Sequence, residues 1–283
     1  MYKRLFLLLI FIFAGVVIER LCHRVTDGFE VANIRSGLEP KAAWATVALN
    51  QNEKDEIRTI LATPFTYLGK GAQSYVFASQ DGKYVLKFFK FQHLRLPPFL
   101  NTIPLPHALD DWRRAKQEKK EAELTKLFQS YKLAFDEVKD ESGLIFIHLN
   151  KSSDLNCRVA LVDRLNIQHS VDADGLEFVL QKRASLVLPT LKAQQEKKAL
   201  LESLAKLLHT LDQKEIYDRD SHLTKNFGFI GDQAILIDCG SLAKKGAEDE
   251  PKIKAGTLKK WLGAEDPELL PFFENALNNA SAL

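Results

Sequence analysis

The chain has 283 residues, of which 46% are hydrophobic and 27% charged. It can therefore bury an ordinary core, and collagen-like, disordered and disulfide-rich miniprotein classes are excluded. Its 39 Lys and Arg against 37 Asp and Glu leave a net charge of +2, which argues against nucleic acid as a partner. Cys22, Cys157 and Cys239 lie far apart and form no CxxC pair. Neither a disulfide framework nor a zinc site is predicted.

The N-terminus indicates a membrane-directed segment. Residues 5–18 are uncharged and follow Lys3 and Arg4. As a helix they would rise about 21 Å, less than the roughly 30 Å hydrocarbon layer and closer to the core of a signal peptide. No small-residue cleavage site follows, so we favour an uncleaved anchor in residues 1–24 over a signal peptide and over a helix buried in the folded body. The flanking charges do not fix its orientation.

Residues 25–62 are expected to form a tether that ends in a short helix. Asn52 is a candidate cap for a helix over residues 53–61. Further along, four prolines between residues 96 and 107 predict an extended loop.

The most informative passage begins at residue 65 and reads FTYLGKGAQSYVFASQDGKYVLKFFK. Its β-branched and aromatic runs predict three strands, with a tight turn at Asp81 and Gly82 between the second and third. Between the first two strands, Gly69 and Gly71 allow backbone amides to approach an anion without a Cβ in the way. The segment is therefore a candidate phosphate-covering loop.

This passage resembles the glycine loop of the protein-kinase-like superfamily, G-x-G-x-x-G-x-V. Gly69 and Gly71 match its first two glycines, Ser74 stands in place of the third, and Val76 lies on the following strand. The sequence VLK, which ends at Lys87, resembles the family's V-A-I-K. The resemblance implies that Lys87 neutralises the α- and β-phosphates of a nucleotide, whereas the segment alone fits an exposed lysine on a sheet edge equally well.

A long amphipathic helix is predicted over residues 112–138, with apolar side chains at three- and four-residue steps. In the resembling family this helix supplies a Glu that pairs with the strand lysine. Glu121 and Glu123 both fit the inward stripe, and we favour Glu121. Strands over residues 143–149, 158–167 and 176–181 are then expected to lead into a hinge between two lobes.

A second group of motifs follows a leucine-rich helix over residues 199–211. Asp220 with the preceding Arg resembles the R-D of H-R-D-x-x-x-x-N, Asn226 resembles its Asn, and Asp238 begins a D-C-G that resembles D-F-G. The resemblance implies that Asn226 and Asp238 hold Mg²⁺ and that Asp220 receives the proton of the acceptor hydroxyl. The loop from Asp220 to Asn226 is one residue too long, so Asp218 stays an alternative.

The acceptor is expected to be small. Only 43 residues follow Gly240, and they contain no A-P-E segment, so a full protein-kinase large lobe is not expected. His222, two residues after Asp220, resembles the D-x-H of small-molecule phosphotransferases. A hydroxyl of a small molecule, sugar or lipid is therefore favoured over a protein substrate.

The predicted fold is α+β, a two-lobed protein-kinase-like arrangement behind an apolar anchor helix. Residues 63–183 would form an N-lobe with an antiparallel sheet and one long helix, and residues 184–283 a shortened, mainly helical C-lobe. The predicted function is a membrane-tethered, single-pass kinase that uses ATP and Mg²⁺, its body facing the cytoplasm if active. A pseudokinase that serves as a nucleotide-binding scaffold and a non-catalytic, membrane-anchored interaction protein are the alternatives.

Overall fold

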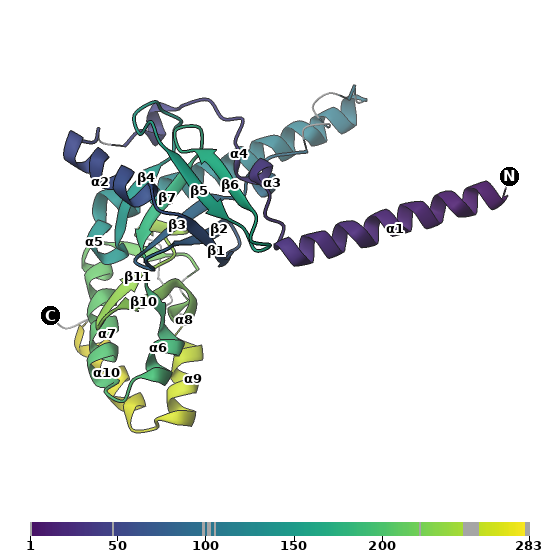
Figure 1. The fold of residues 1–283 in the computed structure, drawn as a ribbon. Coiled ribbons are helices and arrows are strands. Elements are labelled where there is room, and N and C mark those ends of the chain that lie inside the picture. The colour runs from purple at the N-terminus through teal and green to yellow at the C-terminus, as the bar shows by residue number, and fades with distance from the viewer. Residues whose placement is uncertain are drawn as a thin grey trace.

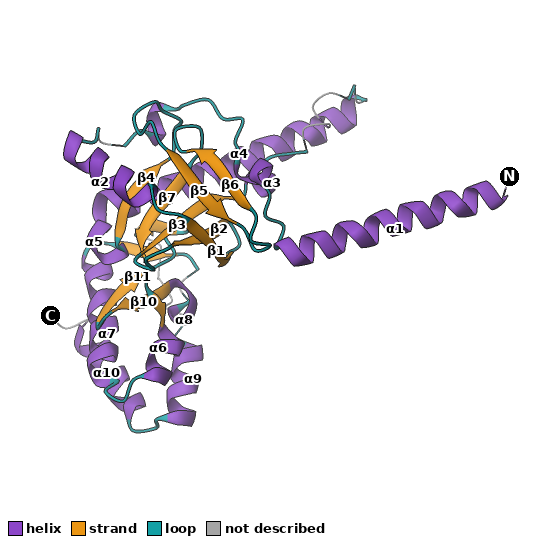
Figure 2. Ribbon diagram, in the orientation of Figure 1, coloured by secondary structure: helices purple, strands orange, loops and turns teal. Residues whose placement is uncertain are grey.

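The computed structural model describes residues 2–46, 48–97, 100, 103–104, 106–220, 222–245 and 255–280. A large curled sheet forms one part of the protein, and a mainly helical part packs beneath it (Figures 1 and 2). This confirms the α+β prediction. Seven strands build the sheet in the order β4-β7-β3-β2-β1-β5-β6. Their bounds are β1 Phe65–Lys70, β2 Ser74–Ser79, β3 Tyr84–Phe89, β4 Leu144–His148, β5 Arg158–Val162, β6 Gln168–Asp172 and β7 Phe178–Lys182.

All neighbouring strands of this sheet pair antiparallel except β1 and β5, which are parallel. The turn between β2 and β3 has Gly82 at φ +72°, a left-handed conformation that favours glycine. The single strand expected over residues 158–167 is instead the first half of a hairpin. Asp163 directly follows β5, and its carboxylate accepts the N–H groups of Leu165 and Ile167, which turns the chain back into β6.

The segment predicted as a tether is part of the folded body. It contains η1 (Val31–Ile34), η2 (Ala42–Trp44) and α2 (Gln51–Leu61). Phe29 and Ile34 are buried in the same apolar cluster as the sheet, together with the inward side of α2. The cap of α2 is Asn50 rather than Asn52: Asn50 Oδ1 accepts the N–H of Glu53 at 3.0 Å, and Glu53 accepts the N–H of Asn50 in return.

The first helix, α1 (Tyr2–Thr26), projects away from the body (Figure 1). Its described apolar side chains are exposed, Phe11 by 79%, so the alternative of a buried N-terminal helix is wrong. Within the described residues, no helix is both long enough and apolar enough to cross a membrane, and the predicted anchor is not supported.

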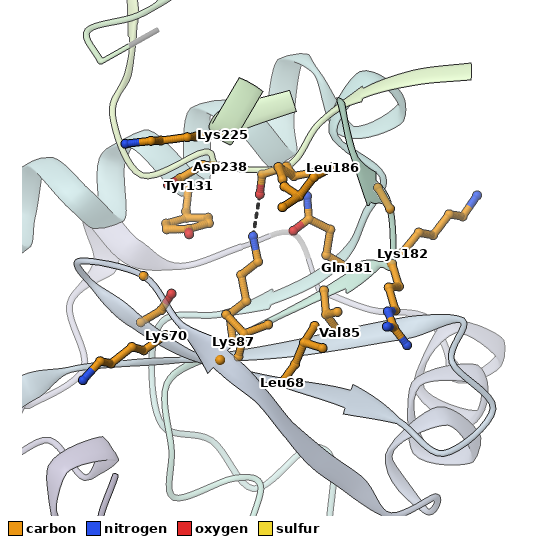
Figure 3. Close-up of a pocket in the computed structure, with 17 residues that line it drawn as sticks. Leu68, Lys70, Val85, Lys87, Tyr131, Gln181, Lys182, Leu186, Lys225 and Asp238 are labelled. Atoms are coloured by element: carbon orange, nitrogen blue, oxygen red, sulfur yellow. Dashed lines mark hydrogen bonds between the residues drawn. The ribbon is translucent and has the colours of Figure 1, made fainter. Parts of the chain in front are cut away.

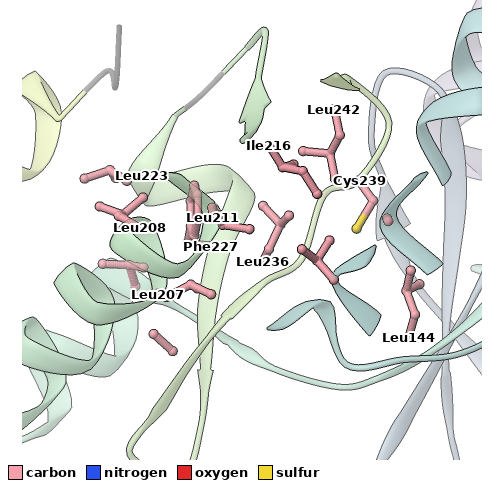
Figure 4. Packing of buried hydrophobic residues seen from close by; sticks show 14 of the residues in the cluster. Leu144, Leu207, Leu208, Leu211, Ile216, Leu223, Phe227, Leu236, Cys239 and Leu242 are labelled. Atoms are coloured by element: carbon pink, nitrogen blue, oxygen red, sulfur yellow. The ribbon is translucent and has the colours of Figure 1, made fainter. Parts of the chain in front are cut away.

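The two predicted lobes share one apolar core. Helix α4 (His107–Glu137) begins five residues before the predicted start, and its inward side chains Leu124, Leu127 and Phe128 belong to the same cluster as the leucines of α7 (Lys198–Gln213). Figure 4 shows Leu207 and Leu211 of α7 among the side chains of this cluster. The other helices are α3 (Phe91–Leu94), α5 (Lys139–Ser142), α6 (Val187–Ala193), α8 (Leu223–Asn226), α9 (Gly256–Glu265) and α10 (Leu269–Ala280).

Two small sheets complete the helical part. The hairpin of β10 (Phe227–Ile230) and β11 (Gln233–Leu236) turns at Gly231, φ +58°, and pairs on its other side with β8 (Ser185–Leu186). Strand β9 (Ile216–Asp218) pairs antiparallel with β12 (Leu242–Lys244). This second pair brings the polar loop after β9 beside the segment that follows β11.

Candidate functional site

The predicted glycine loop joins β1 and β2 and is fastened by hydrogen bonds at its base. The N–H of Gly71 donates to the carbonyl of Ser74 at 2.9 Å. Lys90 Nζ donates to the carbonyl of Gly71 at 2.5 Å and lies 4.9 Å from the ring centroid of Tyr75. Burial, with the nearby charge of Lys70, holds the pKa of Lys90 below its usual value. Lys90 resembles an ordinary surface charge in the sequence, but here it holds the loop.

Lys87 lies under this loop on β3, opposite Val76 of β2. Its Nζ donates to the carbonyl oxygen of Ile237 at 2.5 Å (Figure 3). Ile237 directly precedes Asp238, so two groups that are 150 residues apart in the sequence meet at one point. This hydrogen bond holds the Lys87 ammonium close to the backbone of Asp238, and both residues line the same cavity.

That cavity has a volume of about 340 Å³ and opens between the glycine loop and the start of the helical part. Figure 3 shows Lys87 at its centre, with Leu68 and Val85 on one side and Leu186 and Asp238 on the other. Its wall contains the predicted nucleotide residues Gly69, Gly71, Ser74, Val76 and Lys87 together with Asp238. Basic side chains from outside the predicted set also line it, namely those of Lys70, Lys182, Arg183 and Lys225.

A second cavity of about 160 Å³ adjoins the first and shares Gly71, Ser74, Tyr131 and Asp238 with it. It brings the predicted metal residue Asn226 and the predicted catalytic residue Asp220 to the same wall as Asp238. The glycine loop forms its roof through residues 71–74. The two sequence motifs therefore converge on one cleft.

Backbone contacts fix Asp238 beside Asn226. The carbonyl of Asn226 accepts the N–H of Ile237 at 2.8 Å and that of Asp238 at 3.2 Å. The Asp238 carboxylate in turn accepts the N–H of Gly240 at 3.0 Å through Oδ1. Asn226 Nδ2 donates to Asp218 Oδ2 at 2.7 Å and to the carbonyl of Asp220 at 2.8 Å. Both N–H groups of the Asn226 carboxamide thus donate hydrogen bonds, which leaves the carboxamide oxygen as the atom that could bind a metal.

Asp218 and Asp220, which the sequence leaves as alternatives, have different surroundings. Asp218 also accepts the Ser241 hydroxyl at 2.5 Å and the N–H of Asp220 at 2.9 Å. It therefore orders the loop. The Asp220 side chain is 65% exposed, lines the smaller cavity, and has His222 Nε2 3.4 Å from its Oδ1. Asp220 is placed to contact an incoming group.

The predicted partnership of Glu121 with Lys87 is wrong. Glu121 is exposed and accepts a hydrogen bond from Gln117 of its own helix at 3.0 Å, while Glu123 accepts one from Lys120. The helical stripe that faces inward carries Leu124, Leu127 and Phe128 and, one turn later, Tyr131 at the cavity. Tyr131 occupies the position facing the cleft, and Lys87 is held by a carbonyl instead.

Cys239, which stands where the resembling family has Phe, is fully buried in the shared core (Figure 4). Burial raises the pKa of its thiol to about 12 despite the nearby charge of Lys87. Its carbonyl accepts the Ser130 hydroxyl at 2.5 Å, and the same hydroxyl accepts the N–H of Leu242. Burial, followed by the charge of Asp238, also raises the pKa of Tyr131 well above its usual range. Both groups stay neutral at physiological pH.

Tyr131, Gln181 and Lys225 are among the residues of the cleft that the sequence analysis does not identify. In the sequence, Tyr131 fits the apolar stripe of its helix, and Gln181 fits the end of a predicted strand. Gln181 is 1% exposed, which is unusual for a glutamine. The available signal is its position as a polar residue that directly follows the apolar run FVL.

Comparisons with known proteins add a weak likeness. No protein-family model matches the chain, and no curated protein matches it. Solved structures of WbdD, described as a bifunctional kinase-methyltransferase, align at TM-scores of 0.36 to 0.39 and 13 to 15% identity. The alignments cover 73 to 75% of this chain, and this chain spans only 44 to 46% of those chains. TM-scores below 0.5 do not establish a shared fold, so the geometry of the cleft alone carries the functional conclusion.

Proposed function

We propose that this protein is an ATP-dependent phosphotransferase whose acceptor is the hydroxyl of a small molecule, sugar or lipid. The observation that supports it is the convergence of Lys87, Asn226, Asp238 and Asp220 beneath one glycine loop. An ammonium, a carboxylate with a neighbouring amide oxygen and a further exposed carboxylate are the groups that phosphoryl transfer requires.

Each residue has a distinct role in the proposed reaction. The acceptor oxygen attacks the γ-phosphorus, the bond from that phosphorus to the bridging oxygen breaks, and ADP leaves with the electron pair. Lys87 neutralises charge on the α- and β-phosphates, and the amides of the glycine loop cover them. Asp220 orients the acceptor hydroxyl and takes up its proton. The smaller cavity, which Asp220 lines, leaves room for an acceptor of modest size.

The residues present fit Mg²⁺. The Asn226 carboxamide oxygen and the Asp238 carboxylate share the wall of the smaller cavity, and hard oxygen ligands of this kind suit Mg²⁺ when phosphate oxygens and water complete its shell. Bound there, Mg²⁺ would neutralise charge that develops on the transferring phosphoryl group.

Membrane attachment through residues 5–18 is a further part of the proposal. The exposed side chains of Phe11 and Phe13, on a helix that projects from the body, support it. We further propose that the nucleotide cleft faces the cytoplasm, where ATP is available. Sedimentation with phospholipid vesicles tests it: Phe11→Asp with Phe13→Asp should abolish co-sedimentation, and unchanged binding would contradict it.

The decisive experiment measures binding and turnover of ATP with Mg²⁺ by the full chain. Lys87→Ala and Asp238→Ala should each reduce turnover at least about a hundredfold. Lys83→Ala, an exposed lysine of the β2–β3 turn, and Asp232→Ala, an exposed aspartate of the β10–β11 turn, are matched controls that should leave it unchanged. No binding of any nucleotide, with or without Mg²⁺, would contradict the proposal.

A nucleotide-binding scaffold without turnover is the second candidate. The observations that favour it are the long loop between Asp220 and Asn226 and the absence of an acidic partner for Lys87 on the described residues of α4. Binding of ATP with no hydrolysis, autophosphorylation or transfer to hydroxyl compounds would support the scaffold against the enzyme.

A further inference from the structure

The wall of the larger cavity contains a buried polar atom with no partner. Gln181 is 1% exposed, and its Oε1 has no hydrogen-bond partner among the described residues. A buried acceptor left unpaired is costly, so a structure that keeps one next to a cavity has a place for a donor from a ligand.

The orientation of this carboxamide is fixed by its other end. Gln181 Nε2 donates to the carbonyl of Ser142 at 2.6 Å and to that of Leu236 at 3.3 Å. Both partners are carbonyl oxygens, which only accept, so the nitrogen must face them and the oxygen must face away. In Figure 3 the Gln181 carboxamide lies beside the Lys87 side chain, with its oxygen on the side of Lys87.

Apolar side chains close to Gln181 form a slot for a flat ring. Leu68 and Leu186 are 50% and 44% exposed and lie on opposite sides of the cavity, which Val85 and Gln181 also line (Figure 3). Exposed leucines that face each other across a cavity offer two apolar surfaces to a ring. The ring would lie between them with one edge toward Gln181, while the phosphates extend toward Lys87 and Asp238.

We propose that Gln181 selects adenine over guanine nucleotides by accepting a hydrogen bond from the 6-amino group of the base. Adenine presents an N–H donor at position 6, whereas guanine presents a carbonyl oxygen that would face Oε1 as a second acceptor. The inference rests on the proposed function, because it requires a nucleotide in this cavity.

The test changes the ligand first, so that the full-length wild-type protein is used. Dissociation constants are measured with Mg²⁺ for ATP, for purine riboside triphosphate, which has hydrogen in place of the 6-amino group, and for GTP. Loss of the amino group should weaken binding about tenfold, and GTP should bind more weakly again. Equal binding of ATP and purine riboside triphosphate would overturn the role of Gln181 while leaving the proposed function intact.

A variant then assigns the effect to this side chain. In Gln181→Met the ratio between ATP and purine riboside triphosphate should fall to about one, because thioether sulfur is a weak acceptor. Gln233→Met, an exposed glutamine of β11, is the control and should keep the tenfold ratio. A Gln181→Met protein that is less stable but keeps the ratio would show a purely structural role and overturn the proposal. No binding of any of the three nucleotides would overturn it together with the proposed function.

Discussion

Asn226 Nδ2 donates a hydrogen bond to Asp218 Oδ2 at 2.7 Å, and this contact distinguishes Asp218 from Asp220, the other candidate catalytic aspartate. Asp218 also accepts from Ser241 and from the N–H of Asp220, so its carboxylate orders the loop that carries Asn226, the proposed metal ligand. Asp220 lines the smaller cavity with a side chain that is 65% exposed. The residue that orders the loop and the residue proposed to contact the acceptor are therefore different.

Asp220→Asn should lower the rate of ATP turnover by about 10²- to 10⁴-fold while leaving the melting temperature and the ATP dissociation constant unchanged. The amide keeps the shape of the side chain but takes up no proton. Steady-state kinetics and thermal unfolding measure the two quantities. Unchanged turnover in this variant would exclude Asp220 as the base.

Asp218→Asn should behave differently and lower stability by about 1 to 3 kcal/mol. The new amide places N–H groups where the hydroxyl of Ser241 and the N–H groups of Asn226 and Asp220 now donate. Urea unfolding measures the change, with Asp232→Asn as an exposed control. A stable Asp218→Asn protein that has lost only turnover would reverse the two assignments.

Glu121→Gln should leave ATP turnover within about twofold of wild type. Its carboxylate is exposed and accepts a hydrogen bond from Gln117, whereas Lys87 donates to the carbonyl of Ile237. Glu121 is therefore not the partner of Lys87. Glu118→Gln, on another exposed position of α4, is the matched control. A tenfold or larger loss in Glu121→Gln alone would mean that the helix turns inward when nucleotide binds.

The parts of the site that could be predicted are those encoded locally. Gly69, Gly71 and Lys87 lie on one three-stranded meander, β1–β2–β3, whose strand lengths fix the distance from the loop to the lysine. Asn226 and Asp238 flank a second hairpin, whose strand pairing brings its two ends together. In both cases a short run of sequence determines the geometry, so the pattern of residue types was sufficient.

The parts that could not be predicted depend on contacts between distant segments. The apolar stripe of α4 extends over several turns, and the sequence does not say which turn meets the cleft. The sequence therefore favours Glu121 as the residue that faces the cleft, whereas the structure has Tyr131 there. The segment around Phe29 and Ile34 has no helical or strand periodicity, so the sequence does not predict that these two side chains are buried against the sheet. Burial of Lys90 requires the glycine loop to be in place first.

Ser130→Ala should reduce the free energy of unfolding by roughly 2 to 4 kcal/mol. The hydroxyl of Ser130 serves two buried backbone groups, the carbonyl of Cys239 and the N–H of Leu242, and its loss leaves both unpaired. The exposed neighbour Gln129 provides the control, since Gln129→Ala should change stability by less than about 0.5 kcal/mol. Equal stability of the two variants in urea would show that neither hydrogen bond contributes.

Alkylation should distinguish the three cysteines. Cys22 is exposed, Cys157 is partly buried, and Cys239 is fully buried with its thiol pKa raised to about 12. Only a thiolate reacts rapidly, so at pH 8 iodoacetamide should modify Cys22 first and Cys239 at least about a hundredfold more slowly. Mass spectrometry of timed digests measures the order, and urea should abolish it. Early modification of Cys239 would mean that the segment after Asp238 is not packed in the core.

The glycine loop should be sensitive to a single methyl group at Gly240. A Cβ at this position would lie 2.5 Å from Gln73 Oε1 and 3.2 Å from Leu127 Cδ1, so Gly240→Ala must displace the Gln73 side chain from the roof of the smaller cavity. We expect about fivefold weaker binding of ATP with Mg²⁺. Gly263→Ala, where the nearest atom would be 3.6 Å away, is the matched control.

Removal of the obstructing side chain should reverse this effect, because neighbouring substitutions that share one contact do not add. Gln73→Ala alone is expected to change ATP affinity little, and Gln73→Ala with Gly240→Ala should bind ATP better than Gly240→Ala alone. Calorimetric titration of the four proteins gives the coupling between the two positions. Strictly additive affinities would mean that Gly240→Ala acts through Leu127 or through Asp238, whose Oδ1 would lie 3.3 Å from the new Cβ, and not through Gln73.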